Sequence, residues 1–455
     1  MKKSLEIAAL LLIVFECSIG TVNAQTLTTE TILYSFQSGT DGALPYDGLL
    51  AGASGVFYGT TGQGGNGSNC GTTGCGTVFR LANVSGTWTE SVLHAFNNTD
   101  GSFLRYGSLI SDAAGNLYGA TYYGGAHGRG VVFELSPPPI PNGTWTEMVL
   151  HSFAGGSDGA NPNADLILDA NGNLFGTTQG GGGHGSCLAG LTCGVFFELT
   201  PPPPTDPSRP WTETILFDFK GGSSGGNPNG LIASGGNFFG TTYLGGKSAS
   251  SCNDGTCGVV FKLSKDSNGN WLETVLYSFA GGSDGANPND KLHRDASGNL
   301  FGTTSQGGGS NCLGTGCGTV FEVSPPTTGT VWTETLIHVF GGTGDGIFPL
   351  SPVIGNGSGD IFGTTGQGGG TNCGNDGISG CGIVFKLTPP VPPGTQWTET
   401  ILHKFRGGVS DGAFPTAGLV LVGGKLYGTT VYGGGTGCST QFLTNPGCGT
   451  VYQLQ

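Results

Sequence analysis

The chain has 455 residues and a net charge of −14, and only 10% of its residues carry charged side chains. A chain this acidic repels phosphate groups, which excludes nucleic acid and anionic membrane surfaces as partners. The 91 glycines lack the every-third-residue spacing of collagen, and 26 phenylalanines can fill a core, so we expect a turn-rich all-β protein.

The first 24 residues have the composition of a secretory signal peptide. Lys2 and Lys3 precede an apolar run from Ala8 to Phe15, and Val22-Asn23-Ala24 forms a cleavage site. The segment is too short for a comfortable membrane span. We therefore expect cleavage near Ala24 and export to the periplasm, the cell surface or the medium, without membrane insertion.

From residue 25 onward the chain repeats one unit of about sixty residues. Seven segments similar to W-T-E-T-x-L-H-x-F begin near residues 29, 88, 145, 211, 271, 332 and 397. Each is followed by a D-G-x-x-P loop, an apolar run, the segment G-N-L-F-G-T-T, a Gly-rich loop and G-T-V-F-x-L. Such a period with four short β-type runs is typical of a propeller blade.

The third unit shows the expected order of strands. We place strand A at 164–169, strand B at 172–178, strand C at 193–200 and strand D at 211–219. Asn171-Gly172 suits a tight turn between A and B. The proline-rich segment 201–210 cannot enter a sheet interior and should be an exposed loop between C and D.

The two ends of the repeat region predict how the ring closes. The mature chain begins with a lone D-type strand at 29–36, and the sequence finishes with A, B and C strands. Pairing these segments completes a blade and removes exposed sheet edges. We predict a seven-bladed β-propeller of four-stranded antiparallel blades, formed by one domain over 25–455 after a signal peptide over 1–24.

The unit D-G-x-x-P…G-N-L-F-G-T-T-x-x-G-G…C-G-T-V-F-x-L resembles the GloVer tandem repeat of exported bacterial proteins, over nearly all of residues 28–455. The resemblance implies a secreted or surface-displayed repeat protein with no established biochemical activity. Members of that family often carry a C-terminal sorting or anchoring segment, whereas this sequence stops at the last predicted strand.

Twelve cysteines lie in pairs within six B–C loops, and Cys17 lies in the signal peptide. A zinc site needs four ligands, so pairs from two blades would have to converge, which a ring disfavours. Local disulfides are the better interpretation for an exported chain. The predicted disulfides are Cys70–Cys75, Cys187–Cys193, Cys252–Cys257, Cys312–Cys317, Cys373–Cys381 and Cys438–Cys448.

Three residue types recur once per unit and are interpreted structurally. The Glu of W-T-E-T should hydrogen-bond backbone in the outer strand, because a catalytic pair is needed only once per site. Aspartates that open six of the D-G-x-x-P loops favour Asx-turns. Calcium is the alternative there, and no other cofactor is expected. Exchange of His for Tyr or Phe at one position indicates packing, at His94, His151, His338, His403, Tyr34, Tyr277 and Phe217.

A ligand site is expected where the D–A and B–C loops emerge around the central channel. The residues after each Thr-Thr differ between units, and Tyr and Gln there suit stacking and directional hydrogen bonds to a glycan or peptide. The second unit departs most from the pattern, either by drift or because it carries a site. The predicted ligand-binding residues are Gln63, Arg105, Tyr106, Tyr122, Tyr123, His127, Arg129, Tyr243, Gln306, Gln367 and Tyr432.

The sequence therefore favours an exported, monomeric, non-enzymatic propeller that binds a glycan, another extracellular polymer or a protein. A glycosidase or polysaccharide lyase is the first alternative, and it requires two close carboxylates in one sector. A purely structural surface protein is the second alternative. The non-repeated aspartates suggest no such pair: Asp47, Asp165, Asp254, Asp290 and Asp376.

Overall fold

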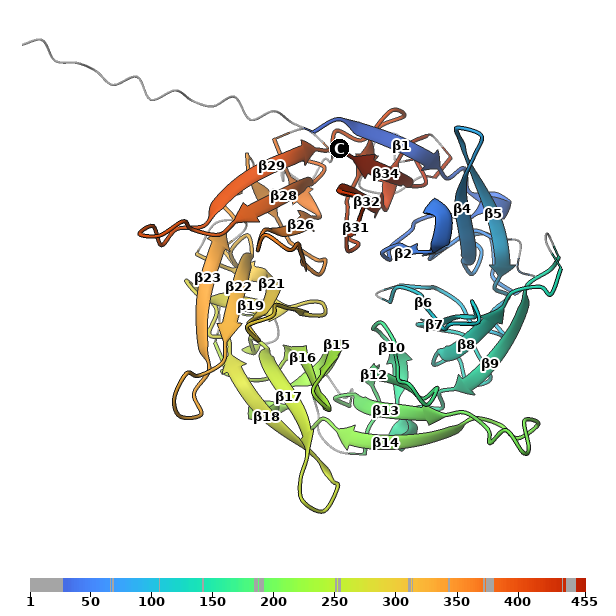
Figure 1. The fold of residues 1–455 in the computed structure, drawn as a ribbon, viewed down its shortest axis with the longest axis horizontal. Helices are drawn as coiled ribbons and strands as arrows, with labels where there is room; N and C mark the ends of the chain where they lie inside the picture. Colours follow the sequence, from blue (N-terminus) through green and yellow to red (C-terminus); the bar gives the residue numbers. More distant parts are fainter. Residues whose placement is uncertain are drawn as a thin grey trace, which may run out of the picture.

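The computed structural model describes residues 28–455 except 66, 68, 106, 141–142, 184–186, 188–191, 250–251, 253–254, 310–311, 313, 343, 371–372, 374–379, 436 and 439–446. Seven antiparallel blades stand around a central axis (Figure 1). The prediction of an all-β, seven-bladed propeller is confirmed. The predicted signal peptide lies outside the described residues, and within them no helix is long and apolar enough to cross a membrane.

Each blade runs from its A strand near the axis to its D strand at the rim. Blade one contains β2 (Leu50–Ala51), β3 (Phe57–Thr61), β4 (Thr77–Val84) and β5 (Thr87–Ala95). Blade two contains β6 (Ile110–Ser111), β7 (Leu117–Thr121), β8 (Val131–Ser136) and β9 (Thr146–Ser152). Blade three contains β10 (Ala160–Pro162), β11 (Ile167–Leu168), β12 (Leu174–Gly180), β13 (Val195–Thr200) and β14 (Thr212–Asp218). Blade four contains β15 (Gly226–Ser234), β16 (Asn237–Leu244), β17 (Val259–Lys265) and β18 (Trp271–Ser278).

The remaining blades follow the same order. Blade five contains β19 (Gly285–Pro288), β20 (His293–Arg294), β21 (Leu300–Gly307), β22 (Thr319–Ser324) and β23 (Thr333–Val339). Blade six contains β24 (Gly346–Ile347), β25 (Ile354–Gly355), β26 (Ile361–Thr365), β27 (Gln367–Gly368), β28 (Ile383–Thr388) and β29 (Thr398–Lys404). Blade seven contains β30 (Gly412–Ala413), β31 (Val420–Val422), β32 (Lys425–Thr430), β33 (Tyr432–Gly433), β34 (Thr450–Leu454) and β1 (Glu30–Ser35). Short 3-10 helices occupy Gly39–Asp41, Ala53–Gly55, Gly156–Asp158 and Gly222–Ser224.

Strand A of the third blade differs from its prediction. It is divided into β10 and β11, which pair with the two ends of β12, Ala160 opposite Gly180 and Ile167 opposite Phe175. Residues 163–166 separate the two segments, and Pro162 has no N–H with which to extend the pairing of β10. Part of the predicted D–A loop therefore belongs to the sheet.

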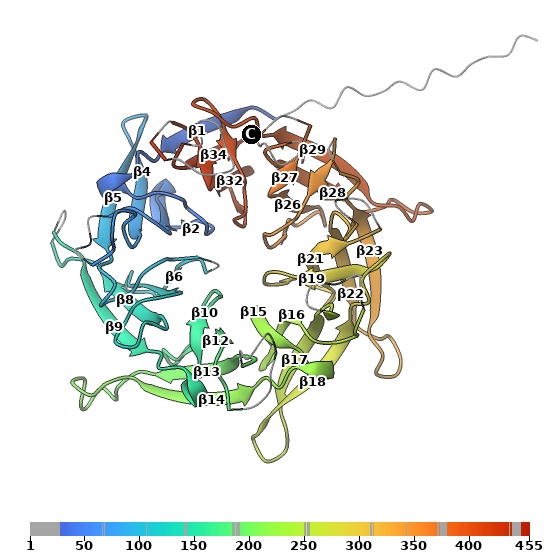
Figure 2. The ribbon, with the colours of Figure 1, turned by 180° about the vertical axis from the view of Figure 1, so that it is seen from behind.

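The ends of the chain close the ring as predicted. β1 pairs antiparallel with β34, from Glu30 opposite Leu454 to Ser35 opposite Thr450. Figures 1 and 2 show the blue N-terminal strand lying along the red C-terminal strands in both views. The backbone N–H of Leu44 then joins blade one to blade seven by donating to the carbonyl of Cys448 at 2.9 Å.

The hydrophobic core lies between neighbouring blades. The phenylalanine that ends each D strand packs edge-on against the C-strand aromatic ring of the next blade, with ring centroids 5.0–5.3 Å apart. Such edge-to-face pairs add stabilisation beyond buried area. The seven pairs are Phe36–Phe79, Phe96–Phe133, Phe153–Phe197, Phe219–Phe261, Phe279–Phe321, Phe340–Phe385 and Phe405–Tyr452.

The second glycine of G-N-L-F-G-T-T is required because the C-strand aromatic ring of the same blade covers it. A Cβ on Gly302 would lie 2.5 Å from Cζ of Phe321. We expect Gly302→Ala to lower the free energy of unfolding by about 1–3 kcal/mol through overpacking. Urea denaturation measures the change. Gly357→Ala is the matched control, since no atom lies within 4 Å of its Cβ position, and an equal loss in both variants would contradict this explanation.

The six predicted disulfides are confirmed, each with Cα atoms 5.0–5.2 Å apart. Each staples a B–C loop whose glycines offer little packing. The carbonyl of the second cysteine also accepts a hydrogen bond from the D–A loop of the next blade. The disulfides therefore hold the contact surface between blades as well as the loop.

Candidate functional site

Every D-G-x-x-P loop approaches the axis through one residue with a left-handed backbone. The residue before the proline, or before Leu104 in blade two, has φ of 55–59°. Its N–H donates, at 2.7–3.0 Å, to the second cysteine of the preceding blade, or to Arg129 in the blade without cysteines. Asparagine tolerates this φ, whereas leucine and phenylalanine carry strain. The seven residues are Leu44, Phe103, Asn161, Asn227, Asn287, Phe348 and Phe414.

The two threonines of G-T-T fix the neighbouring strand ends. The second threonine donates its hydroxyl hydrogen to the carbonyl two residues later, at 2.7–2.8 Å in all seven blades. The first threonine reaches the A segment of the next blade in five blades, as in Thr177 to the Asn229 carbonyl at 3.0 Å. The ends of strands A and B are thus held rigidly around the axis.

These strand ends enclose a cavity of ≈ 390 Å³, which we call the axial pocket. The residue directly after each loop proline, or after Leu104, contributes to its wall in all seven blades. Strand-B ends supply most of the remaining residues. The complete lining is Tyr46, Arg105, Asn163, Gln179, Asn229, Tyr243, Asn289, Ser305, Gln306, Phe348, Leu350 and Thr416.

The wall of the axial pocket is polar, largely uncharged and partly aromatic. Five carboxamides from blades three, four and five face it, and the Arg105 guanidinium lies 4.9 Å from the centre of the Tyr46 ring. Buried polar atoms without a hydrogen bond include Oε1 of Gln306, Oδ1 of Asn163 and Oγ1 of Thr416. Buried polar atoms are normally satisfied, so these three have capacity for a ligand.

A second cavity of ≈ 20 Å³ shares Tyr46 and Thr416 with the axial pocket. Asp47, Asp165 and Asp290 line it together with Lys291. The expectation that the non-repeated aspartates form no close group is therefore wrong for these three, because the A strands of blades one, three and five meet at the axis. Asp254 and Asp376 lie outside the described residues.

Each of these aspartates has a different environment. Asp47 is buried and accepts hydrogen bonds from the Thr60 hydroxyl at 2.7 Å and the Gly107 N–H at 3.0 Å. Asp165 is ion-paired with the ammonium group of Lys291. Burial, reinforced by the negative charge of Asp165, raises the pKa of Asp290 to about 8. This shift favours the protonated form of the Asp290 carboxyl, which can donate a hydrogen bond.

Five of the predicted binding residues lie in or beside the axial pocket. Arg105, Tyr243 and Gln306 line it. Tyr122 donates a hydrogen bond to Oε1 of the lining residue Gln179. Tyr432 lies at the edge of the axial pocket. Burial raises the pKa of Tyr432, as does the charge of Tyr46, whereas the charge of Arg105 lowers it.

The other predicted residues lie elsewhere. Tyr123 is 48% exposed, and its ring packs edge-on against Tyr122. Gln63 and Gln367 pair through their backbones with Ala43 and Ile347. His127 and Arg129 are exposed in the B–C loop of blade two. Burial lowers the pKa of His151, and the nearby His127 lowers it further. Tyr106 lies outside the described residues.

The structure also brings in residues that the sequence argument missed. The post-proline residues Tyr46, Asn163, Asn229, Asn289 and Thr416 line the axial pocket, whereas the predicted site drew on the variable positions after Thr-Thr. A signal was present, since the residue directly after the loop proline is asparagine in three units and tyrosine, leucine or threonine in the other three.

The repeated Glu, His and Asp side chains meet between blades. In four interfaces a D-strand His, the following loop Asp and the D-strand Glu of the next blade place ligand atoms within 4.8 Å of one another. The Oε1 atoms of the seven D-strand glutamates are buried and make no hydrogen bond, and the expected bond from glutamate to backbone stays a prediction. The His position is polar as well as packed. Tyr34 fills it in another interface and donates to Asp41 at 3.0 Å. The expectation of calcium stays a prediction.

The solved structures that the chain resembles differ widely from it in sequence. A protein of unknown function from Dyadobacter fermentans DSM 18053 has 9% identity and a TM-score of 0.42, covering 94% of this chain and 99% of its own. A fungal alcohol oxidase of the AA5 family in complex with copper has 12% identity and a TM-score of 0.52, covering 94% and 76%. Trypanosoma rangeli sialidase in complex with sialic acid has 9% identity and a TM-score of 0.39, and the match covers 94% of this chain and 58% of the sialidase.

These likenesses describe the fold and do not identify an activity. No curated protein matches the sequence. The Gloeobacter/Verrucomicrobia repeat matches residues 16–189 and 189–442, and the chain therefore belongs to that repeat family.

Proposed function

We propose that the protein is an exported, monomeric binding protein that takes part of a neutral glycan into the axial pocket. The observation that carries the proposal is that the post-proline residues of all seven blades converge on one cavity whose walls are amides, hydroxyls and aromatic rings. Aromatic faces and carboxamides complement the apolar faces and hydroxyl groups of sugars. The six disulfides fit an oxidising, extracytoplasmic environment.

The polar atoms without partners indicate which ligand groups fit. Gln306 Oε1 and Asn163 Oδ1 can only accept hydrogen bonds, so they require a ligand that donates. Sugar hydroxyls donate, whereas a carboxylate or phosphate does not. The strongly negative net charge also disfavours an anionic polymer.

Removing these polar atoms should separate binding from stability. We expect Thr416→Val with Gln306→Leu to weaken glycan binding at least about tenfold while unfolding temperature stays equal or rises. Each unsatisfied buried group costs about 1–3 kcal/mol in the free protein, so its removal relieves that cost and deletes a ligand contact. A glycan array identifies the ligand, and calorimetry with differential scanning fluorimetry measures both effects.

The control is Thr328→Val, an exposed threonine of the loop between β22 and β23 that does not line the pocket. It should leave the affinity unchanged. A wild-type protein that binds no glycan at millimolar concentration would refute the proposal, as would a pocket variant that binds with unchanged affinity.

The carboxylates beneath the pocket favour a second candidate, a glycan-cleaving enzyme. Glycosidic bond hydrolysis uses one protonated carboxyl and one carboxylate. Asp290, whose pKa is raised by burial, suits the first role, and Asp165, which is ion-paired with Lys291, suits the second. Turnover of the bound glycan that disappears in Asp290→Asn would replace the binding function by this one. Unchanged glycan after prolonged incubation would exclude it.

A further inference from the structure

Four of the seven blade interfaces contain the same set of ligand-type atoms. Each has one imidazole nitrogen and two carboxylate oxygens within 4.8 Å of one another, and the residues are partly buried rather than sealed from solvent. Within the described parts of the chain the groups are His94–Asp100–Glu147, His151–Asp158–Glu213, His338–Asp345–Glu399 and Glu30–His403–Asp411.

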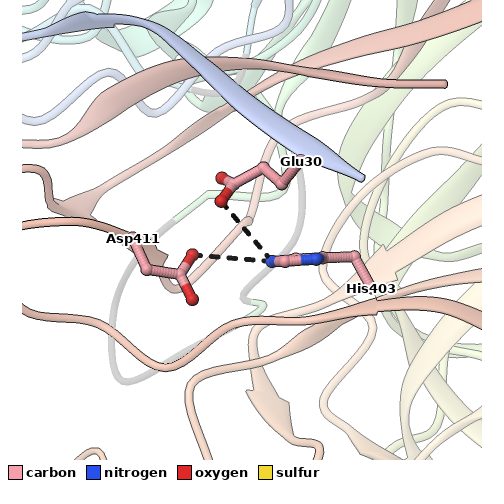
Figure 3. A group of neighbouring side chains, drawn as sticks. All are labelled: Glu30, His403 and Asp411. Carbon is pink, nitrogen blue, oxygen red and sulfur yellow. Dashed lines mark ion pairs between the residues drawn. The ribbon is translucent and has the colours of Figure 1, made fainter. Parts of the chain in front are cut away.

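The last group shows the geometry most clearly. Figure 3 shows the ring edge of His403 pointing between the carboxylates of Glu30 and Asp411. Nε2 of His403 lies 3.7 Å from Oε2 of Glu30 and 3.5 Å from Oδ1 of Asp411. Three ligands at ordinary zinc bond lengths in a tetrahedron are ~3.3–3.5 Å apart. The three side chains therefore need only small movements to share one ion.

Several ligand atoms in these groups lack hydrogen-bond partners, whereas Nε2 of His94 and of His151 is hydrogen-bonded to the aspartate of its own group at 3.2 and 3.1 Å. Nε2 of His338 and of His403 and Oε1 of all four glutamates are buried and make no hydrogen bond. The Glu30 side chain is 9% exposed and comes from the blade that follows His403 and Asp411. In the His338 group the unsatisfied nitrogen and oxygen face each other, with Nε2 of His338 3.7 Å from Oε1 of Glu399. Buried polar atoms are normally satisfied, so this arrangement is that of a ligand site rather than of a packed interface.

We propose that each of these four groups binds one Zn²⁺, which joins two neighbouring blades through His and Asp of one blade and Glu of the next. Imidazole and carboxylate donors suit zinc, whereas calcium and magnesium prefer oxygen ligands alone. Two carboxylates this close repel each other, and a divalent cation between them neutralises that repulsion. Three protein ligands leave a fourth position for water.

The same chain contains natural interfaces without the histidine. Tyr34 faces Asp41, and its pKa is affected by Glu90, while Tyr277 faces Asp284 and Glu334. In both, the tyrosine hydroxyl donates to the aspartate at 3.0 Å, which satisfies the oxygen that zinc would need. Tyrosine is therefore a replacement that this interface already accommodates.

The experiment measures the number of zinc ions bound per chain. Folded protein is stripped with a chelator, dialysed against micromolar free Zn²⁺ and analysed by atomic absorption. We expect four zinc ions per wild-type chain, one for each group. His403→Tyr should bind one ion fewer, and the variant with tyrosine at His94, His151, His338 and His403 should bind none.

The tyrosine variants must keep the circular dichroism spectrum and cooperative melting of the stripped wild-type protein. Zinc should raise the melting temperature of the wild-type protein and not that of the fourfold variant. A zinc content that does not fall with each His→Tyr replacement overturns the proposal. So does a wild-type melting temperature that zinc leaves unchanged, because the ions would then not join the blades.

Discussion

A chain that begins at residue 37 is expected to lose cooperative unfolding and to be recovered mainly as aggregate, whereas a chain that begins at residue 25 folds. The shorter chain lacks β1, so β34 becomes an open edge in the seventh blade. Unpaired edges with an apolar face associate with other chains.

The expected loss is large because β1 contributes to the core as well as to the sheet. Leu33 is 8% exposed and Phe36 is 0% exposed. The ring of Phe36 lies 5.2 Å from that of Phe79 in the next blade. Loss of a buried phenylalanine costs about 3–5 kcal/mol on its own, against a net stability of about 5–15 kcal/mol for a typical domain.

Thermal unfolding followed by circular dichroism measures this effect, and analytical ultracentrifugation measures the aggregation. A synthetic peptide of residues 25–36, added during refolding, should restore part of the cooperative transition. Equal melting temperatures for the two chains would mean that β1 does not close the ring.

Stability in the presence of a chelator is expected to fall as pH rises from 5 to 8. In the interfaces without histidine, burial raises the pKa of Glu90, Glu273 and Glu334 from 4.5 to about 7. The charge of Asp41 adds to the shift of Glu90, and that of Asp284 adds to the shift of Glu334. Hydrogen bonds from Ser224 to Glu273 and from Tyr277 to Glu334 act in the opposite direction.

The direction of this change in stability follows from the difference in proton binding between the folded and the unfolded chain. Between pH 4.5 and 7 the folded protein holds protons on these glutamates that the unfolded chain has released, so rising pH favours the unfolded chain. The stabilisation is complete below pH 4.5 and is lost as pH passes 7. One pKa unit corresponds to about 1.4 kcal/mol, so each partly buried glutamate contributes at most about 3 kcal/mol.

Urea denaturation at several pH values, with chelator present, measures the slope. Glu90→Gln, Glu273→Gln and Glu334→Gln together should reduce it, because glutamine does not ionise. Glu322→Gln, outside these interfaces, is the control. An unchanged slope in the triple variant would show that the interface glutamates do not titrate as argued.

The repeated features of the fold could be predicted from the sequence because each is local. Asn171-Gly172 marks a turn, Cys312 and Cys317 are near enough in sequence to bond, and the unpaired D-type strand at 29–36 implies closure. Each of these patterns is weak evidence in a single unit, and its recurrence along the chain makes it a reliable prediction. The number of blades followed from that count.

The candidate site could not be predicted fully because it depends on how blades meet. Asp47 and Asp290 come two residues after their proline and Asp165 three residues after its own, so no shared spacing marks them as a group. Glu30 and His403 are far apart in sequence and become neighbours only when the ring closes. Single-unit patterns contain no information about such contacts.

The most direct test of the central claim is the dissociation constant of the glycan selected by the array, measured for wild type, Tyr243→Ala and Tyr123→Ala. Both tyrosines follow a Thr-Thr or Ala-Thr pair, but Tyr243 lines the axial pocket and Tyr123 is 48% exposed outside its lining. The account predicts at least a tenfold weaker affinity, about 1.4 kcal/mol, for Tyr243→Ala and none for Tyr123→Ala. Equal affinities for wild type and Tyr243→Ala, or a loss confined to Tyr123→Ala, would contradict it.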